Sequence, residues 1–207
     1  MTQYPVNLHL EGRSCLVVGG GEVAARKVAG LVEAGATVSV VAPRIGAALE
    51  LRTDIEVHRR PYRTGDLHGH WLAIAATDDP ATNATVFRDG EEARVWVNGA
   101  DDPAHCSFTL PSVLRRGDLV VAVSTGGRSP ALARWLRQRL AEELGPEYET
   151  LLELLAAERA AVKADGRSTE QLDWAAALDS QLLGLIRDGD LVSAQERLST
   201  CLSSSSA

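Results

Sequence analysis

The sequence predicts an α/β protein with a parallel, doubly wound sheet in its first half and helices alone at its C-terminal end. A run of glycines separates a buried apolar segment from a helical one within residues 14–34. Apolar strand-like and helical segments then alternate as far as residue 99. From residue 147 on, the apolar residues recur only at helical spacing.

The glycine run has the context of a dinucleotide-binding turn. The segment 14–34, SCLVVGGGEVAARKVAGLVEA, reads as strand, turn and helix. Gly19 allows a tight turn, Gly21 lets a pyrophosphate approach the backbone, and Ala24 is small enough for close packing of helix and strand. The free N–H groups at the helix start can bind the anion. We therefore expect a nucleotide site here, with a merely structural turn as the alternative.

The segments on either side of this turn extend the α/β pattern. Residues 4–10 alternate in polarity, which is typical of an edge strand or an extended arm. We expect further strands at Thr37–Ala42, Ile55–Arg59, Trp71–Ala76 and Val95–Gly99, and a helix at Pro80–Glu92.

Residues just after two of these strands are candidates for cofactor contacts, because ligands of open α/β sheets lie at the carboxyl ends of the strands. Pro43 and Arg44 follow the second strand, where no acidic residue is present to hold ribose hydroxyls. Arg44 could hold a 2′-phosphate, so local chemistry leaves NAD and NADP open, and a solvated cation is the alternative. Thr77 and Asp78 follow the fourth strand, and they could equally cap the helix that starts at Pro80.

The pattern changes after residue 99. We expect a turn at residues 100–103, short strands at Cys106–Leu110 and Leu119–Ser124, and a helix at Pro130–Leu144. Two or three helices should fill residues 147–198, and Ser203–Ser206 should be a disordered tail. The tryptophans lie in apolar runs, so we expect them in the core or at an interface.

Composition excludes several classes of function. The chain has 207 residues and a formal net charge of −7, which argues against nucleic acid as a partner. No apolar run approaches 18 residues and the N-terminus has no signal-peptide pattern, so we expect a cytoplasmic protein that does not enter a membrane. Three scattered cysteines form neither a disulfide scaffold nor a zinc motif, and His105 beside Cys106 is not a ligand set. We therefore expect no metal site.

Several stretches, taken in order, carry a resemblance to a known family. They are VVGGGEVAARK, VVAP, WLAIAATDD, VNGADDPAHCSF, LPSV and VAVSTGGRSPALARWLR, within about residues 4–145. The chain resembles the precorrin-2 dehydrogenase / sirohydrochlorin ferrochelatase family, the stand-alone counterpart of the N-terminal part of siroheme synthase. The chain is expected to lack the methyltransferase domain of the larger enzymes.

The resemblance implies three parts: a Rossmann-like NAD-binding domain at 1–113, a small α+β dimerisation segment at 114–145, and an all-helical domain at 146–207. It implies NAD-dependent oxidation of precorrin-2 to sirohydrochlorin, with ferrous iron inserted as well by some members. It also implies a homodimer with the tetrapyrrole between subunits, and NAD as the cofactor despite the missing acidic residue.

The resemblance also implies residue roles in the first domain. Asp101, the first Asp of the ADDP turn, matches the family's catalytic aspartate, which takes a proton during dehydrogenation. A turn-forming Asp is the alternative, and Asp102 is the rival carboxylate, well placed for an Asx turn. Gly19, Gly21, Glu22 and Val23 match pyrophosphate and ribose contacts, and Pro43 and Arg44 match the adenosine side.

For the substrate, the resemblance points to the loop 124–129. Hydroxyls and N–H groups of Ser124, Thr125 and Gly126 could hold carboxylate side chains of the tetrapyrrole, while Ser129 caps the next helix. Arg128, Arg134 and Arg137 are candidates for a basic lining, with a solvated helix face as the alternative. The rival function is a nucleotide-sensing domain that acts on a partner through its helical tail.

Overall fold

A computed structural model of the chain describes residues 3–170 and 172–204. The chain forms two compact units, Met1–Leu110 (unit 1) and Pro111–Ala207 (unit 2). The three-part division at residues 113 and 145 stays a prediction.

Unit 1 is built on a five-stranded parallel sheet, as the sequence predicts. The strands lie in the order β3-β2-β1-β4-β5, and neighbouring strands run parallel. From β1 the chain moves outward to β2 and then to β3. It then crosses back over β1 to form β4 and β5 on the other side. The strands are β1 (Ser14–Val18), β2 (Thr37–Val41), β3 (Ile55–His58), β4 (Leu72–Ala75) and β5 (Trp96–Gly99).

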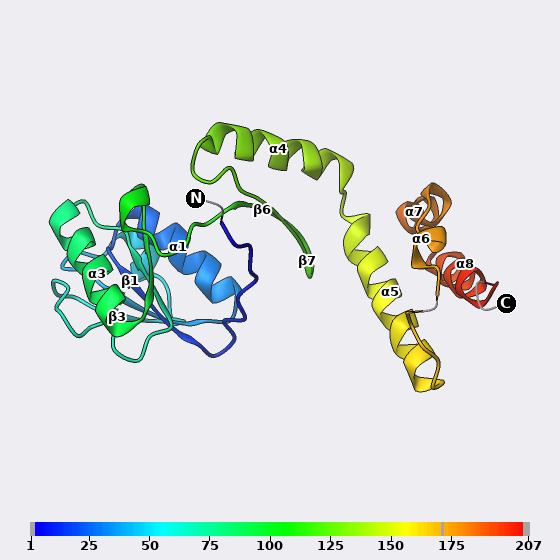
Figure 1. Ribbon diagram of the computed structural model, residues 1–207, viewed down its shortest axis with the longest axis horizontal. Coiled ribbons are helices and arrows are strands. Elements are labelled where there is room, and N and C mark those ends of the chain that lie inside the picture. The colour runs from blue at the N-terminus through cyan, green and yellow to red at the C-terminus, as the bar shows by residue number, and fades with distance from the viewer. Residues whose placement is uncertain (1–2, 171, 205–207) are drawn as a thin grey trace. The chain divides into compact units, whose positions relative to one another are not determined.

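Helices cover both faces of this sheet (Figure 1). Helix α1 (Glu22–Glu33) places Ala24 and Val28 in one apolar core with alternate residues of β1, β2 and β4. Helix α3 (Pro80–Ala93) places Val86 in a second core with the intervening residues of those strands. Burial of both faces explains why β1 and β4 are uninterrupted apolar runs. A short helix, α2 (Ala47–Glu50), was not expected from the sequence.

Two expectations for unit 1 differ from the structure. Cys106–Leu110 was expected to be a strand, and this is wrong: Cys106 makes a single antiparallel bridge to Asn98, preceded by the short 3-10 helix η1 (Pro103–His105). The Asn98 side chain takes the place of further strand pairing, because its amide donates to the Phe108 carbonyl over 2.9 Å. The lead-in at residues 3–10 forms no strand, so the edge-strand alternative is wrong, and Leu10 is its one buried residue.

Unit 2 begins with a two-stranded antiparallel hairpin. Strands β6 (Ser112–Arg116) and β7 (Leu119–Val123) pair around a turn at Gly117, whose φ is 54°. Only β7 was predicted, since β6 contains two arginines and buries Leu114 alone. Helix α4 (Pro130–Glu143) packs against both strands. The Arg116 guanidinium donates to the carbonyls of Leu144 and Ala141 over 2.8 and 3.2 Å, which ties the hairpin to the end of α4.

Four helices complete the described part of unit 2, rather than two or three. They are α5 (Glu147–Ala164), α6 (Trp174–Ala177), α7 (Ser180–Arg187) and α8 (Leu191–Ser204), and they share one apolar core. Helix α8 continues through Ser203 and Ser204, where a disordered tail was expected, and positions 205–206 lie outside the described residues. Among residues 3–170 and 172–204, no helix combines the length and hydrophobicity needed to cross a bilayer.

Candidate active site

The glycine turn after β1 is pressed against neighbouring backbone. Gly19 has φ 131°, and a Cβ there would lie 2.2 Å from the Ala76 carbonyl oxygen at the end of β4. At Gly20 a Cβ would lie 2.0 Å from the Arg44 carbonyl oxygen. The Gly20 carbonyl also accepts a hydrogen bond of 2.8 Å from Gly46 N. The glycine pattern predicts roles for Gly19 and Gly21 alone, but Gly20 packs as tightly as Gly19.

The next residues leave an open space at the start of α1. Nothing lies within 4 Å of a Cβ built on Gly21, which is the N-cap of α1 and gives the helix no side-chain cap. The N–H groups of the first turn, which begins with the exposed Glu22 and the half-buried Val23, therefore face this space. Ala24 is fully buried, as close packing of helix and sheet requires. These features fit the pyrophosphate of a dinucleotide.

The segment after β2 lies directly beside the glycine turn. Pro43 and Arg44 are exposed, and the Arg44 carbonyl is the atom that excludes a side chain at Gly20. Within the described residues the Arg44 guanidinium makes no ion pair. The structure thus brings the predicted pyrophosphate and adenosine segments together at one end of the sheet.

At the end of β4, the residue that caps α3 is Asp79, which follows the two predicted cofactor contacts Thr77 and Asp78. Asp79 is the N-cap of α3 and accepts from Ala81 N and Thr82 N over 3.1 and 3.2 Å. The Thr77 hydroxyl donates to the buried Asn83 side chain over 2.8 Å. Thr77 is therefore committed to the start of α3, whereas Asp78 is exposed at the strand end.

The two carboxylates after β5 have different environments. Asp102 accepts from Ala104 N over 3.2 Å and lies 2.6 Å from His105 Nδ1. The hydrogen bond with His105 lowers the pKa of Asp102 below its ordinary value. Asp101 is exposed, has the left-handed φ of 61°, and makes no side-chain hydrogen bond within the described residues. Non-glycine residues in this conformation cluster at functional sites. Asp102 thus has the turn-forming role, and Asp101 is the carboxylate left available for chemistry.

Backbone hydrogen bonds place Asp101 on the same edge as the glycine turn. Ala76 N donates to Val18 O and Ala100 N donates to Ala75 O, both over 2.8 Å. Since β1, β4 and β5 are parallel neighbours, the residues after them follow one another along that edge. It is where ligands of open α/β sheets bind.

The loop 124–129 of unit 2 is held largely by its own hydrogen bonds. The Thr125 hydroxyl accepts from Ser129 N and lies 3.1 Å from Ser129 O, and Ser124 Oγ accepts from Gly126 N over 3.2 Å. Ser129 Oγ accepts from Leu132 N, so it caps α4 as expected. Gly126 and Gly127 have φ of 63° and 78°. Both hydroxyls of Ser124 and Thr125 and the N–H groups of Gly126, Arg128 and Ser129 are therefore engaged within the loop itself.

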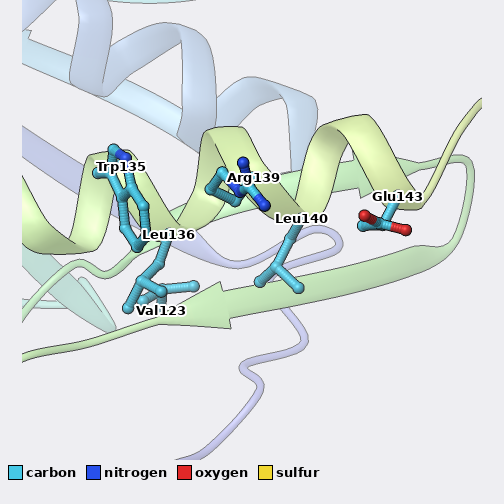
Figure 2. Close-up of a pocket in the computed structure, with 6 residues that line it drawn as sticks. All are labelled: Val123, Trp135, Leu136, Arg139, Leu140 and Glu143. Atoms are coloured by element: carbon cyan, nitrogen blue, oxygen red, sulfur yellow. The ribbon is translucent and has the colours of Figure 1, made fainter.

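Cations and apolar side chains share the surface beyond this loop. Arg128 and Arg134 are exposed and Arg137 is half-buried, and none makes an ion pair in the described part of the chain. Figure 2 shows apolar side chains of α4 and β7 lining an open groove of ≈330 Å³. Among the described residues, no group of three or more His, Cys, Asp or Glu side chains could hold a metal ion.

Comparisons with known proteins cover nearly the whole chain. Residues 6–112 match a family described as putative NAD(P)-binding, and residues 116–143 match the sirohaem biosynthesis protein central family. A siroheme synthase of Photorhabdus laumondii is 36% identical over 96% of this chain and 43% of its own length. One of Azotobacter vinelandii is 46% identical over 79% of this chain and 36% of its own length. The chain thus spans less than half of these relatives. A solved structure named SirC, precorrin-2 dehydrogenase, superposes with a TM-score of 0.68 at 28% identity over 96% of this chain and 98% of its own.

Proposed function

The chain belongs to the siroheme-biosynthesis family that joins a putative NAD(P)-binding domain to a sirohaem central segment, and from this membership we propose that it catalyses the NAD-dependent oxidation of precorrin-2 to sirohydrochlorin. The observation that carries the proposal is an available carboxylate, Asp101, on the sheet edge that also carries the glycine turn. The similarity to siroheme synthases and to a precorrin-2 dehydrogenase supports the choice of substrate.

In this proposal the residues of unit 1 hold the dinucleotide. Gly19 and Gly20 bring the backbone close, and the N–H groups at the start of α1 bind the pyrophosphate. Glu22 and Val23 contact the ribose, Pro43 and Arg44 lie on the adenosine side, and Asp78 lies near the nicotinamide end. When bound, the cofactor supplies the acceptor for a hydride.

The proposed cofactor is NAD, since the family resemblance favours it, although the exposed Arg44 offers a contact for a 2′-phosphate. Binding titrations with both dinucleotides test this choice. An affinity for NADP at least tenfold above that for NAD would contradict it.

Asp101 is the proposed base. Loss of a hydride from precorrin-2 leaves a cation, and loss of a proton from that cation completes the oxidation. An ionised carboxylate at the strand end can take this proton. The left-handed backbone holds Asp101 out from the turn, while Asp102 and His105 fix the rest of the turn through their own contact.

Unit 2 is proposed to bind the macrocycle and a second copy of the chain. The loop 124–129, with the exposed Arg128 and Arg134, would bind the substrate carboxylates. The groove in Figure 2 is lined by the exposed Trp135 and other apolar side chains, with Arg139 and Glu143 among them, and it offers a surface for a homodimer contact. This proposal keeps a cytoplasmic location as an expectation from the sequence.

A dehydrogenase assay with precorrin-2 and NAD tests the function. Asp101→Asn suits the left-handed backbone and removes the base, so we expect turnover to fall at least about a hundredfold while NAD affinity is kept. Asp102→Asn is the matched control and should retain most of the turnover. Normal NADH production by Asp101→Asn would contradict the proposed role.

The same assay distinguishes the rival sensor function, for which the protein would bind NAD and produce no NADH from precorrin-2. Repeating it with ferrous iron tests iron insertion, which stays a prediction from the family resemblance.

A further inference from the structure

Lys27 is a half-buried cation for which neither the fold nor the proposed reaction has yet given a role. The chain has 21 basic residues other than histidine, and only Lys27 and Lys163 are lysines. Lys27 lies in the second turn of α1, between the buried Ala24 and Val28. Within the described residues its ammonium makes no hydrogen bond or ion pair. Burying part of a cation without such a partner costs free energy, so something else must compensate for its charge.

The chain that follows the Asp101 turn returns to the face of the sheet that α1 covers. Cys106 bridges back to Asn98, Ser107 N donates to Val97 O over 2.7 Å, and Phe108 packs into the core that α1 covers. The segment 106–108 therefore lies on the α1 face, while η1, between it and Asp101, packs against α3. The Lys27 ammonium interacts electrostatically with the Asp101 carboxylate and with the Cys106 thiol.

The groups around Lys27 shift its pKa in opposite directions. Burial lowers the pKa of the Lys27 ammonium below its ordinary value, and neighbouring Arg26 lowers it further. Asp101 and Cys106 oppose this change. The other charged groups in the turn that carries Asp101 are Asp102 and His105, and these two are paired with each other.

We propose that Lys27 is a positioning residue for Asp101: from α1 its ammonium attracts this carboxylate and keeps it ionised when the macrocycle covers it. The inference rests on the proposed dehydrogenation. A macrocycle over Asp101 displaces water, and a carboxylate without water favours its neutral form, which cannot act as a base. Lys27 restores the balance from a flank that the substrate does not reach.

The step is balanced without any change at Lys27. The hydride takes its electron pair from precorrin-2 to the nicotinamide ring, and the proton released from the substrate goes to the Asp101 carboxylate. Lys27 stays protonated throughout. A lysine suits this role because its ammonium is a compact point charge, whereas an arginine would spread its charge over a planar fork.

The first test needs no turnover. NMR of the full chain without cofactor can follow the titration of both lysine side chains, and Lys163, exposed on α5, serves as the internal reference. Asp101→Asn removes the facing charge, so the pKa of Lys27 should fall by about half a unit or more while that of Lys163 stays unchanged. An unchanged Lys27 titration would overturn the proposal.

The second test uses the pH profile of precorrin-2 oxidation. Lys27→Gln should lower kcat/KM about tenfold and move the acid limb to higher pH, with NAD affinity unchanged. Lys27→Arg keeps the charge and should restore most of kcat/KM. Arg26→Gln is the control for loss of a neighbouring charge on the same helix, and it should leave both the rate and the acid limb in place.

Two results would overturn the proposal: a wild-type pH profile for Lys27→Gln, or a loss of NAD affinity that accounts for its lower rate. An inactive wild-type protein would refute the proposed function instead, and the titration would still decide whether Lys27 and Asp101 form a pair.

Discussion

The two units differ in how much of their apolar surface they bury by themselves. In unit 1, β1 and β4 are enclosed between α1 and α3. In unit 2, β7 alternates between half-buried and exposed residues, α4 buries only Ala133, and Trp135 is 55% exposed. A second open groove, of ≈730 Å³, lies between α5 and α6. The difference means that unit 1 buries its central strands by itself, whereas the hairpin and α4 of unit 2 leave apolar side chains exposed.

The largest loss of stability is expected from a substitution in the core that helices α5–α8 of unit 2 enclose. Leu198 of α8 is 0% exposed, so Leu198→Ala should lower the free energy of unfolding by about 3 kcal/mol. Val192, 71% exposed on the same helix, is the control, and Val192→Ala should change the free energy of unfolding by less than about 0.5 kcal/mol. Chemical denaturation measures both. Equal effects would mean that the helices of unit 2 are not packed as described.

The glycine turn tests the packing of unit 1. Gly20→Ala forces a Cβ against the Arg44 carbonyl and should cost about 2–3 kcal/mol of stability together with NAD binding. Gly21→Ala meets no protein atom and should leave the melting temperature unchanged while it weakens NAD binding. If Gly21→Ala bound NAD normally, the open space beside it would not be the pyrophosphate site.

A smaller effect concerns the acid stability of unit 1. The side chain of Asp66 is 13% exposed. Partial burial opposes its ionisation, but hydrogen bonds from the Arg60 guanidinium and from Arg63 N outweigh this effect and lower the pKa of Asp66. A depressed pKa contributes stability that is present above the unfolded value near 3.8 and is lost as pH falls through the lower folded value.

Arg60→Gln should therefore cost about 1 kcal/mol at pH 7 and show a smaller loss than wild type between pH 5 and 3. Denaturation at several pH values measures this. Parallel pH curves for the two proteins would rule out the pair as a source of acid sensitivity.

The smallest effect on stability should come from the exposed face of unit 2. Trp135→Ser removes an exposed side chain, so the free energy of unfolding of the dilute chain should change by less than about 0.5 kcal/mol. The same change should weaken self-association in sedimentation experiments. Unaltered self-association would exclude Trp135 from the dimer contact.

The contrast between the units also explains what the sequence could predict. Strands buried on both faces are uninterrupted apolar runs, and β1 and β4 were found for that reason. Strand β6, SVLRR, is apolar on one side only and carries Arg115 and Arg116, so its pattern resembled a loop. The segment after Cys106 has the composition of a strand, but the Asn98 side chain takes its hydrogen bonds.

The candidate site, like the fold, was predictable only where a local sequence motif marks it. Asp101 and the glycine turn were identified from motifs, and the confirmed family resemblance supports their positions, while their roles stay proposals. Gly20 was missed because its constraint is the Arg44 carbonyl, which is distant in sequence. Lys27 was missed because a lysine on a helix ordinarily indicates a solvated face. The tryptophans were expected in the core or at an interface, but Trp71, Trp96 and Trp135 are about half exposed, which excludes the core.

The attachments at the two ends of α4 have a mechanical consequence. Thr125 and Ser129 fasten the start of this helix to the end of β7, and Arg116 fastens its last carbonyls to the end of β6. The hairpin and α4 are thus attached to each other at both ends of the helix, so neither can rotate without the other. Helix α5 also contacts β7, and its Glu149 side chain lies against Gly117 in the hairpin turn, so the hairpin is braced by the helices on both sides of Gly145 and Pro146.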